Sequence, residues 1–303
     1  MTQTGEGAAA GTTAVPGDAV AVDVPGVQRR AVRVLSGSQA LTGVAVAGAI
    51  PAGSLIASGV AGNEAAAGFA QTFGVVGAAL AALPLARLTL GGGRRRALSV
   101  GLGIGAVGAV LVVLGAQARV LWLIYLGCLF VGCATAAGYQ ARYAAADLAE
   151  PHLVGRALSV VVWASTVGAV LGPNLLETSG RLALALGLPQ LAGPYVVAAA
   201  ALALAVLLLQ TFLRPDPYLV ARRLARVPGQ ARDRASSSLR AGLSHVRRHP
   251  RAQLGIVAVA LGHAVMVMVM VMTPVHMRHV DVRLQLIGLV ISVHVAGMYA
   301  LSP

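Results

Sequence analysis

Two long apolar runs meet at a short basic stretch, and this pattern limits the possible folds more than any other feature of the chain. Residues 91–96 read Gly-Gly-Gly-Arg-Arg-Arg, with one apolar run ending near Leu85 and the next beginning at Ala97. Each run is close to the roughly 20 residues that a helix needs to cross the hydrocarbon core of a bilayer. Because arginine is costly at that depth, the basic stretch must lie in water between two membrane-spanning helices.

The composition extends this interpretation to the whole chain. Hydrophobic residues make up 57% of the 303 residues and charged residues only 11%, whereas a soluble domain carries about 25% charged residues. We therefore predict an all-α integral membrane protein. The net charge of +13 comes from arginines in the expected loops, which favours contacts with anionic lipid headgroups over nucleic-acid binding. All 23 basic residues are arginine, so the lysine of a P-loop is missing and ATP-driven transport is excluded.

The alternation of apolar runs and polar turns predicts eight spans. They cover, approximately, residues 34–60, 65–85, 97–116, 120–139, 157–175, 191–213, 252–272 and 286–303. We expect a disordered tail at 1–33, a six-helix bundle at 34–213, a basic linker at 214–251 and two helices of a second bundle at 252–303. Of the 23 arginines, 19 fall in segments on one side of this arrangement and 4 on the other. The positive-inside rule therefore predicts a cytoplasmic N-terminus.

Three local motifs, together with six spans followed by a basic linker, resemble the major facilitator superfamily. Residues 93–98, Gly-Arg-Arg-Arg-Ala-Leu, are similar to the second half of the loop signature that follows span two in that family. Residues 168–173, Gly-Ala-Val-Leu-Gly-Pro, resemble the Gly-x-x-x-Gly-Pro motif of its proton-coupled exporters. Residues 150–157, Glu-Pro-His-Leu-Val-Gly-Arg-Ala, resemble its acidic-Pro-x-x-x-Gly-Arg-Ala turn after span four.

The chain departs from the family pattern at two positions. Leu90 stands where the loop signature has an aspartate, and Cys128 stands where many members have an arginine inside span four. The aspartate is thought to help latch the inner gate, so the resemblance implies a gate that is weaker or latched differently. The family has twelve spans in two six-span halves. The chain thus looks like one half plus a fragment of the second, and its end at Pro303, within a span, suggests a truncation.

The resemblance implies a secondary transporter in a bacterial plasma membrane that exports a small molecule, coupled to protons, by alternating access. We expect a monomer surrounded by lipid, with no cofactor, no metal, no nucleic-acid partner and no enzymatic activity. An importer of the same fold stays open as an alternative. So does a receptor or scaffold without transport, which the two departures from the family pattern would suit.

The candidate site residues fall into two groups. Those expected to act in gating or in the motifs are Gly93, Arg94, Arg95, Arg96, Arg142, Asp147, Arg156, Gly168, Gly172 and Pro173. Those expected to line a substrate cavity are Gln71, His263, Met266, Met270 and His294. For Arg142 and Asp147 two interpretations are open: a charge pair with the arginine loop, or ordinary solvated loop charges.

The cluster of methionine and histidine in span seven invites a metal interpretation. His263, Met266 and Met270 share one face of a helix, and imidazole with thioether ligands suits soft ions. Met268 and Met272 lie on another face, however, and methionine is also a flexible apolar filler. We therefore predict no metal site, and His263 is either a substrate-contacting or proton-carrying group or a packed histidine.

Overall fold

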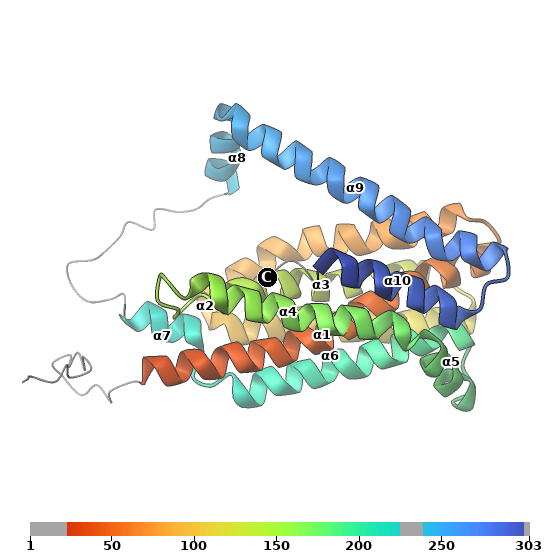
Figure 1. The fold of residues 1–303 in the computed structure, drawn as a ribbon, viewed down its shortest axis with the longest axis horizontal. Coiled ribbons are helices and arrows are strands. Elements are labelled where there is room, and N and C mark those ends of the chain that lie inside the picture. Colours follow the sequence, from red (N-terminus) through yellow and green to blue (C-terminus); the bar gives the residue numbers. More distant parts are fainter. Residues whose placement is uncertain (1–22, 225–238, 300–303) are drawn as a thin grey trace, which may run out of the picture.

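The computed structural model describes residues 23–224 and 239–299, and throughout these ranges the regular structure is helical (Figure 1). Most of the long helices run side by side in one bundle, from which the first part of α9 diverges; α7 lies at one end of the bundle, and α8 lies at the end of α9 that points away from it. The α-helices are α1 (Val24–Ala61), α2 (Ala65–Ala118), α3 (Leu121–Ala144), α4 (Val154–Asn174), α5 (Leu176–Ala185), α6 (Gly193–Phe212), α7 (Pro217–Leu224), α8 (Leu239–Arg248), α9 (Pro250–His279) and α10 (Leu284–Tyr299).

The 54 residues of α2 form two antiparallel passes rather than one long helix. The backbone at Gly93 leaves the helical region, with φ 82° and ψ 173°. A side chain at Gly101 would contact Leu85, although these residues would lie about 24 Å apart along a continuous helix. The predicted basic loop is therefore a reversal at a single glycine, which suits this residue because positive φ is strained for others.

The described helices confirm the prediction of an all-α membrane protein. Six of them are long and apolar enough to cross a bilayer, and α2 supplies two passes because it reverses at Gly93. The shorter α10 occupies the position of the eighth expected span. Exposed leucine and valine side chains cover the outside of the bundle, as expected for surfaces that face lipid.

Several helix boundaries differ from the sequence-based expectation, among them the end of α9, which reaches His279 rather than 272. Helix α1 begins at Val24, so residues 24–33 are helical rather than part of a disordered tail, and Asp23 caps this helix through the backbone N–H of Gly26 at 3.0 Å. Helix α3 continues to Ala144, beyond the expected end at 139. Two helices, α7 and α8, lie within the expected linker. The expected tail at 1–22 and the linker arginines at 226, 232 and 234 lie outside the described residues.

Small residues set the spacing of the helices around α1. A side chain at Gly168 or Gly172 of α4 would overlap the backbone of α1 near Ala40 and Val44. Glycines four residues apart thus let two helices approach closely, which is how membrane helices pack when lipid provides no hydrophobic driving force. The motif at 168–173 accordingly lies at the α1–α4 contact.

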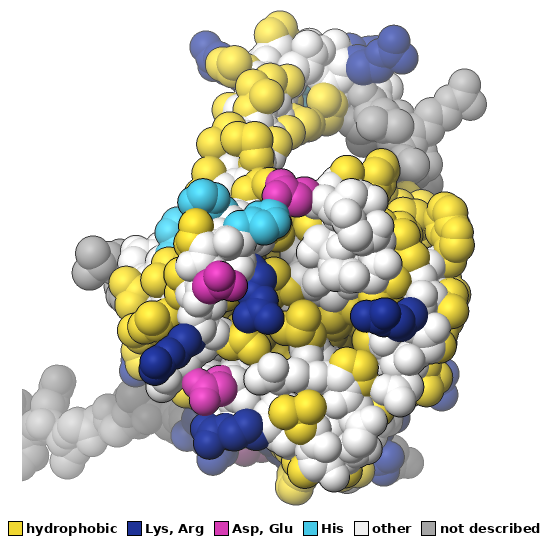
Figure 2. Space-filling view, turned by 90° about the vertical axis from the view of Figure 1, so that its right-hand side faces the viewer, with side chains coloured by type: hydrophobic (Ala, Val, Ile, Leu, Met, Phe, Trp, Pro, Cys, Tyr) yellow, Lys and Arg dark blue, Asp and Glu magenta, His cyan; other side chains and the backbone are white. Residues whose placement is uncertain are grey.

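Helices α9 and α10 contact the bundle mainly at the end that carries α5 and the α9–α10 turn, here called the α5 end (Figure 1). Val271, Pro274 and Val275 of α9 are buried there, whereas most of α9 before Val271 is exposed. His279 pairs with Glu64 in the α1–α2 turn at 3.0 Å. Arginine, acidic and histidine side chains are scattered over this end among uncharged surface (Figure 2). The opposite end, with α7 and the Gly93 reversal, is called the α7 end.

Candidate functional site

A cavity of about 340 Å³ lies between the bundle and helices α9 and α10. Its walls come from α1, α2, α3, α4, α6, α9 and α10. This volume is at the small end of the range of about 300–1,000 Å³ that ligand sites usually have. On α3 the lining residues recur every three or four positions and form one stripe: Cys128, Val131, Gly132, Thr135, Gly138, Tyr139 and Arg142.

Four of the five residues expected at a substrate cavity line this one. Gln71 comes from α2, and His263, Met266 and Met270 come from α9. Met268 and Met272 face away, with 61% and 41% of their surface exposed. The structure does not bring His294 to the cavity, because its side chain is exposed on α10 and does not contribute to the lining. Val295 and Met298 are the α10 residues in the cavity lining.

Many of the uncharged polar groups of the cavity wall already have hydrogen-bond partners, either within their own helix or on a neighbouring one. Gln39 of α1 donates a hydrogen bond from Nε2 to the carbonyl oxygen of Gly138 at 3.0 Å. Thr42 donates to the carbonyl oxygen of Ser38 in its own helix at 2.8 Å. Cys128, at the position of the family arginine, lies 3.8 Å from the hydroxyl of Tyr195. These contacts leave a mainly apolar wall with a few fixed polar groups, which is typical of small-molecule sites.

Arg142 is the exception, because its charge has no described partner. It lies in the last turn of α3 and lines the cavity. Its Nε atom is buried without a hydrogen bond, and its guanidinium lies 5.2 Å from the ring centre of Tyr139. Throughout the described residues no carboxylate forms an ion pair with it. The structure thus separates Arg142 from Asp147, with which the sequence analysis had grouped it.

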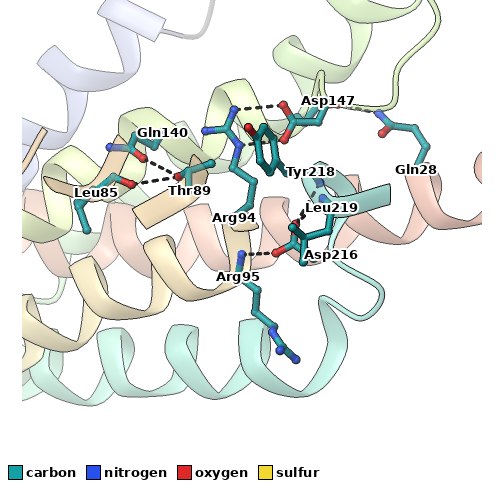
Figure 3. Close-up of polar contacts among 11 residues, drawn as sticks. Gln28, Leu85, Thr89, Arg94, Arg95, Gln140, Asp147, Asp216, Tyr218 and Leu219 are labelled. Carbon is teal, nitrogen blue, oxygen red and sulfur yellow. Dashed lines mark hydrogen bonds and ion pairs between the residues drawn. The ribbon is translucent and has the colours of Figure 1, made fainter. Parts of the chain in front are cut away.

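Asp147 instead pairs with Arg94 at the α7 end (Figure 3). Arg94 donates from Nε to Oδ2 at 2.8 Å and from Nη2 to Oδ1 at 3.1 Å. Only 15% and 14% of the two side chains is exposed. A two-pronged pair with this little exposure fixes both distance and orientation. It joins the Gly93 reversal to the turn after α3.

Helix α7 binds the same reversal from the other side (Figure 3). Asp216 accepts a hydrogen bond from the backbone N–H of Arg95 at 2.8 Å and caps α7 through the N–H of Tyr218 at 3.0 Å. The ring of Tyr218 lies 5.7 Å from the Arg94 guanidinium. Arg222 donates to the carbonyl oxygen of Leu90 at 3.0 Å. The contacts of Arg94, Arg95, Asp147, Asp216, Tyr218 and Arg222 are here called the clasp.

Within the clasp, Asp216 places a carboxylate against the Gly93 reversal. This is the loop in which Leu90 stands at the position of the signature aspartate. The sequence analysis missed Asp216, Tyr218 and Arg222 because they lie in a segment that it treated as one basic linker. A local signal was available: in Pro215-Asp216-Pro217, an aspartate precedes a proline. Aspartate is a favoured N-cap and proline a favoured first helical residue, so the start of α7 could have been recognised.

The other predicted motif residues lie outside the clasp or at its edge. Arg96 and Arg156 are exposed, and no described ion pair includes either of them. Pro173 is buried and contacts Gly288 of α10 through its carbonyl group. Next to it, Asn174 donates a hydrogen bond to the Ser292 hydroxyl at 2.8 Å. The contacts of Pro173 and Asn174, at the end of the 168–173 motif, therefore join α4 to α10.

The comparison with known families is decisive for the class of protein. The sequence profile of the Major Facilitator Superfamily matches residues 35–303. The chain belongs to the Major Facilitator Superfamily. This confirms the resemblance drawn from the motifs and makes the chain a multi-pass membrane protein of a transporter family.

Curated relatives within the superfamily match most of the chain. It is 38% identical over 271 residues to the uncharacterized MFS-type transporter YdeG of Bacillus subtilis, covering 89% of this chain and 62% of the relative. It is 34% identical over 280 residues to YddS, another uncharacterized MFS-type transporter of that organism, covering 91% and 63%. The riboflavin transporter RfnT of Brucella anthropi is 26% identical over 275 residues, covering 90% and 65%. The chain therefore spans less than two thirds of the length of these relatives.

No solved structure matches the chain. Among the described residues there is no group of three or more histidine, cysteine, aspartate or glutamate side chains that could hold a metal ion. The site is therefore characterised by its cavity, by the Arg142 guanidinium that faces it and by the clasp at the α7 end.

Proposed function

We propose that this protein is a secondary transporter that moves a small molecule by alternating access, with the cavity as its substrate site. The observation that carries the proposal is the position of the cavity, between the bundle and the first two helices that follow the linker. In transporters of this kind the substrate lies where two halves meet, and rocking of one half against the other exposes it to either side. Membership in the superfamily supports the same mechanism.

The clasp is proposed to hold the α7 end rigid during this rocking. It joins the reversal in α2, the turn after α3 and helix α7, all before α9 begins. These contacts therefore lie within the first half and its linker, whereas contacts between α4 and α10 form the boundary that must shift. We propose that the α7 end is cytoplasmic, because the arginine excess of the chain lies there and cytoplasmic segments carry such an excess.

Export coupled to protons is the finer part of the proposal. Its support is the glycine motif at 168–173, which resembles that of proton-coupled exporters, and His263 in the cavity wall. An imidazole can take up and release a proton near neutral pH. None of the described carboxylates lines the cavity, so His263 is the described residue proposed to carry the proton. The name of RfnT supports a small organic molecule as substrate class.

Transport in proteoliposomes tests this function. The protein is reconstituted, a pH gradient is imposed, and accumulation of a panel of radiolabelled organic acids, amines and flavins is measured. We expect gradient-dependent flux of at least one class, directed as export, and loss of the gradient dependence in His263→Gln. The matched control is His276→Gln, on the same helix but outside the cavity lining.

Each alternative predicts a different outcome. Flux in the opposite direction would identify an importer. Flux that does not respond to the pH gradient would refute proton coupling but not transport. Absence of flux for every class would contradict transport and favour a receptor or scaffold.

A further inference from the structure

We propose that Arg142 is an anion-recognition group and that the cavity takes a small organic anion: an oxyanion, carboxylate or phosphate, attached to an apolar body. This inference rests on the proposed function and names the substrate class of the same cavity. It begins from the one formal charge among the described lining residues, the guanidinium of Arg142.

The position of Arg142 follows from the helical repeat of α3. The cavity stripe on this helix runs from Cys128 to Arg142 with steps of three or four residues, so Arg142 continues the same face. Over 14 residues a helix rises about 21 Å. The cavity is therefore elongated along α3, with a cationic group at the α7 end and the Cys128–Tyr195 contact far from it.

The described carboxylates that could neutralise Arg142 have other partners or lie away from the cavity. Both oxygens of Asp147, five residues further along, accept hydrogen bonds from Arg94. Asp216 caps α7 and contacts Arg95. The remaining acids of the described ranges pair with neighbours or lie away from the cavity lining: Asp23, Glu64, Glu150, Glu177 and Asp281.

An arginine in this setting favours binding of an anion. Its guanidinium stays protonated in proteins, so it cannot relieve its burial by becoming neutral. An unpaired charge that is partly removed from water is costly, and an oxyanion would offset that cost through two parallel charge-assisted hydrogen bonds. The Nε–H of Arg142 is buried and has no acceptor among the described residues, and this is one of the donors that such a pair uses.

The remaining lining residues indicate that the part of the ligand away from its anionic group is apolar. Val46, Ile50, Val75, Met266 and Met270 line the cavity and offer apolar contacts, and methionine adapts to flat rings. A volume of about 340 Å³ leaves room for a body of one or two rings. The ligand would therefore carry its anionic group at one end and an apolar body at the other.

A matched pair of probes tests the proposal directly. Binding of the fluorescent acid 2-naphthoate is compared with that of its uncharged counterpart 2-naphthamide. The protein is held in maltoside micelles at about pH 7.5, where a carboxylic acid is ionised, and fluorescence anisotropy is read against empty micelles. We expect the acid to bind at least about tenfold more tightly than the amide, since a hydrogen bond to a charged group is worth that much.

Variants assign the preference to one residue. Arg142→Gln should remove the preference for the acid, and Arg142→Lys should keep part of it, because lysine retains the charge but not the planar fork. Arg29→Gln makes the same charge change at an exposed residue of α1 outside the cavity and should leave the preference unchanged. Thermal unfolding of each variant identifies any loss that comes from misfolding.

Three results would overturn the proposal. One is equal binding of the acid and the amide, as expected if a carboxylate outside the described residues already neutralises Arg142. Another is a preference that survives in folded Arg142→Gln. The third is displacement of 2-naphthoate by short-chain phosphatidylglycerol at a lower concentration than by benzoate, which would assign the guanidinium to a lipid phosphate. If the protein prefers 2-naphthoate but transports nothing, the transport proposal is rejected and the anion proposal stands. If it transports uncharged compounds but does not prefer 2-naphthoate, the anion proposal is rejected and the transport proposal stands.

Discussion

The clasp and the cavity each contain an arginine from the same region of the chain, but the surroundings of the two side chains are opposite. Arg94 is held by both oxygens of Asp147 and by the ring of Tyr218. Arg142 has no described ion-pair partner and faces a cavity. Arg94 thus has a counterion among the described residues, whereas Arg142 has none there. Burial alone does not tell a structural charge from a binding charge, because the difference lies in whether the protein supplies the counterion.

The largest expected effect on stability comes from removing one partner of the Arg94–Asp147 ion pair. Asp147→Asn leaves the Arg94 guanidinium little exposed and without its anion, and we expect the free energy of unfolding to fall by about 3 kcal/mol. Unfolding is measured in detergent by thermal or denaturant titration. The double variant Arg94→Leu/Asp147→Leu should be more stable than the single one, because it leaves no unpaired charge. A single variant as stable as the wild type would show that the pair contributes little.

The second effect concerns the reversal itself. Gly93→Ala places a side chain at positive φ and against the Asp216 carboxylate, so we expect a loss of about 1–3 kcal/mol. Gly91→Ala is the matched control, because a side chain there would meet nothing within 4 Å. Equal stability of the two variants would contradict a role of Gly93 in the clasp.

A smaller effect is expected at the cap of α7. Asp216→Asn keeps a capping side chain but loses the charge on the contact with the Arg95 N–H, so we expect a loss of about 0.5–1 kcal/mol. Hydrogen exchange of residues 217–224 should become faster. Asp281→Asn, exposed at the α5 end, changes the same charge and should leave exchange in α7 unaltered. Exchange in α7 that does not respond to Asp216→Asn would exclude the cap as its anchor.

The smallest effect on stability is expected at Arg142, and this prediction tests the comparison most directly. Arg142→Gln removes a charge without a described counterion, so the change in unfolding free energy should stay within about 0.5 kcal/mol. Arg94→Gln, the same substitution in the clasp, should be strongly destabilising. Similar losses in both variants would mean that Arg142 also has a structural partner and would remove the distinction between the two regions.

Local patterns predicted much of the fold because each signal acts over a few residues. Apolar runs of sufficient length specify membrane helices, and the Gly91–Arg96 stretch marked where the chain turns back. The stripe of His263, Met266 and Met270 was visible as a helical face, and these residues do line the cavity. The prediction for His294 was wrong because nothing in the local sequence fixed which face of α10 turns inward.

By itself, the amino-acid sequence determined the membrane class, the family and the positions of the spans, because hydrophobicity and short motifs act locally along the chain. The tertiary structure decided which charges meet. Arg94 and Asp147 are 53 positions apart, and Arg95 and Asp216 are 121 apart. Such pairings depend on how helices pack, which no local pattern records. The same packing left Arg142 facing the cavity without an anionic partner among the described residues.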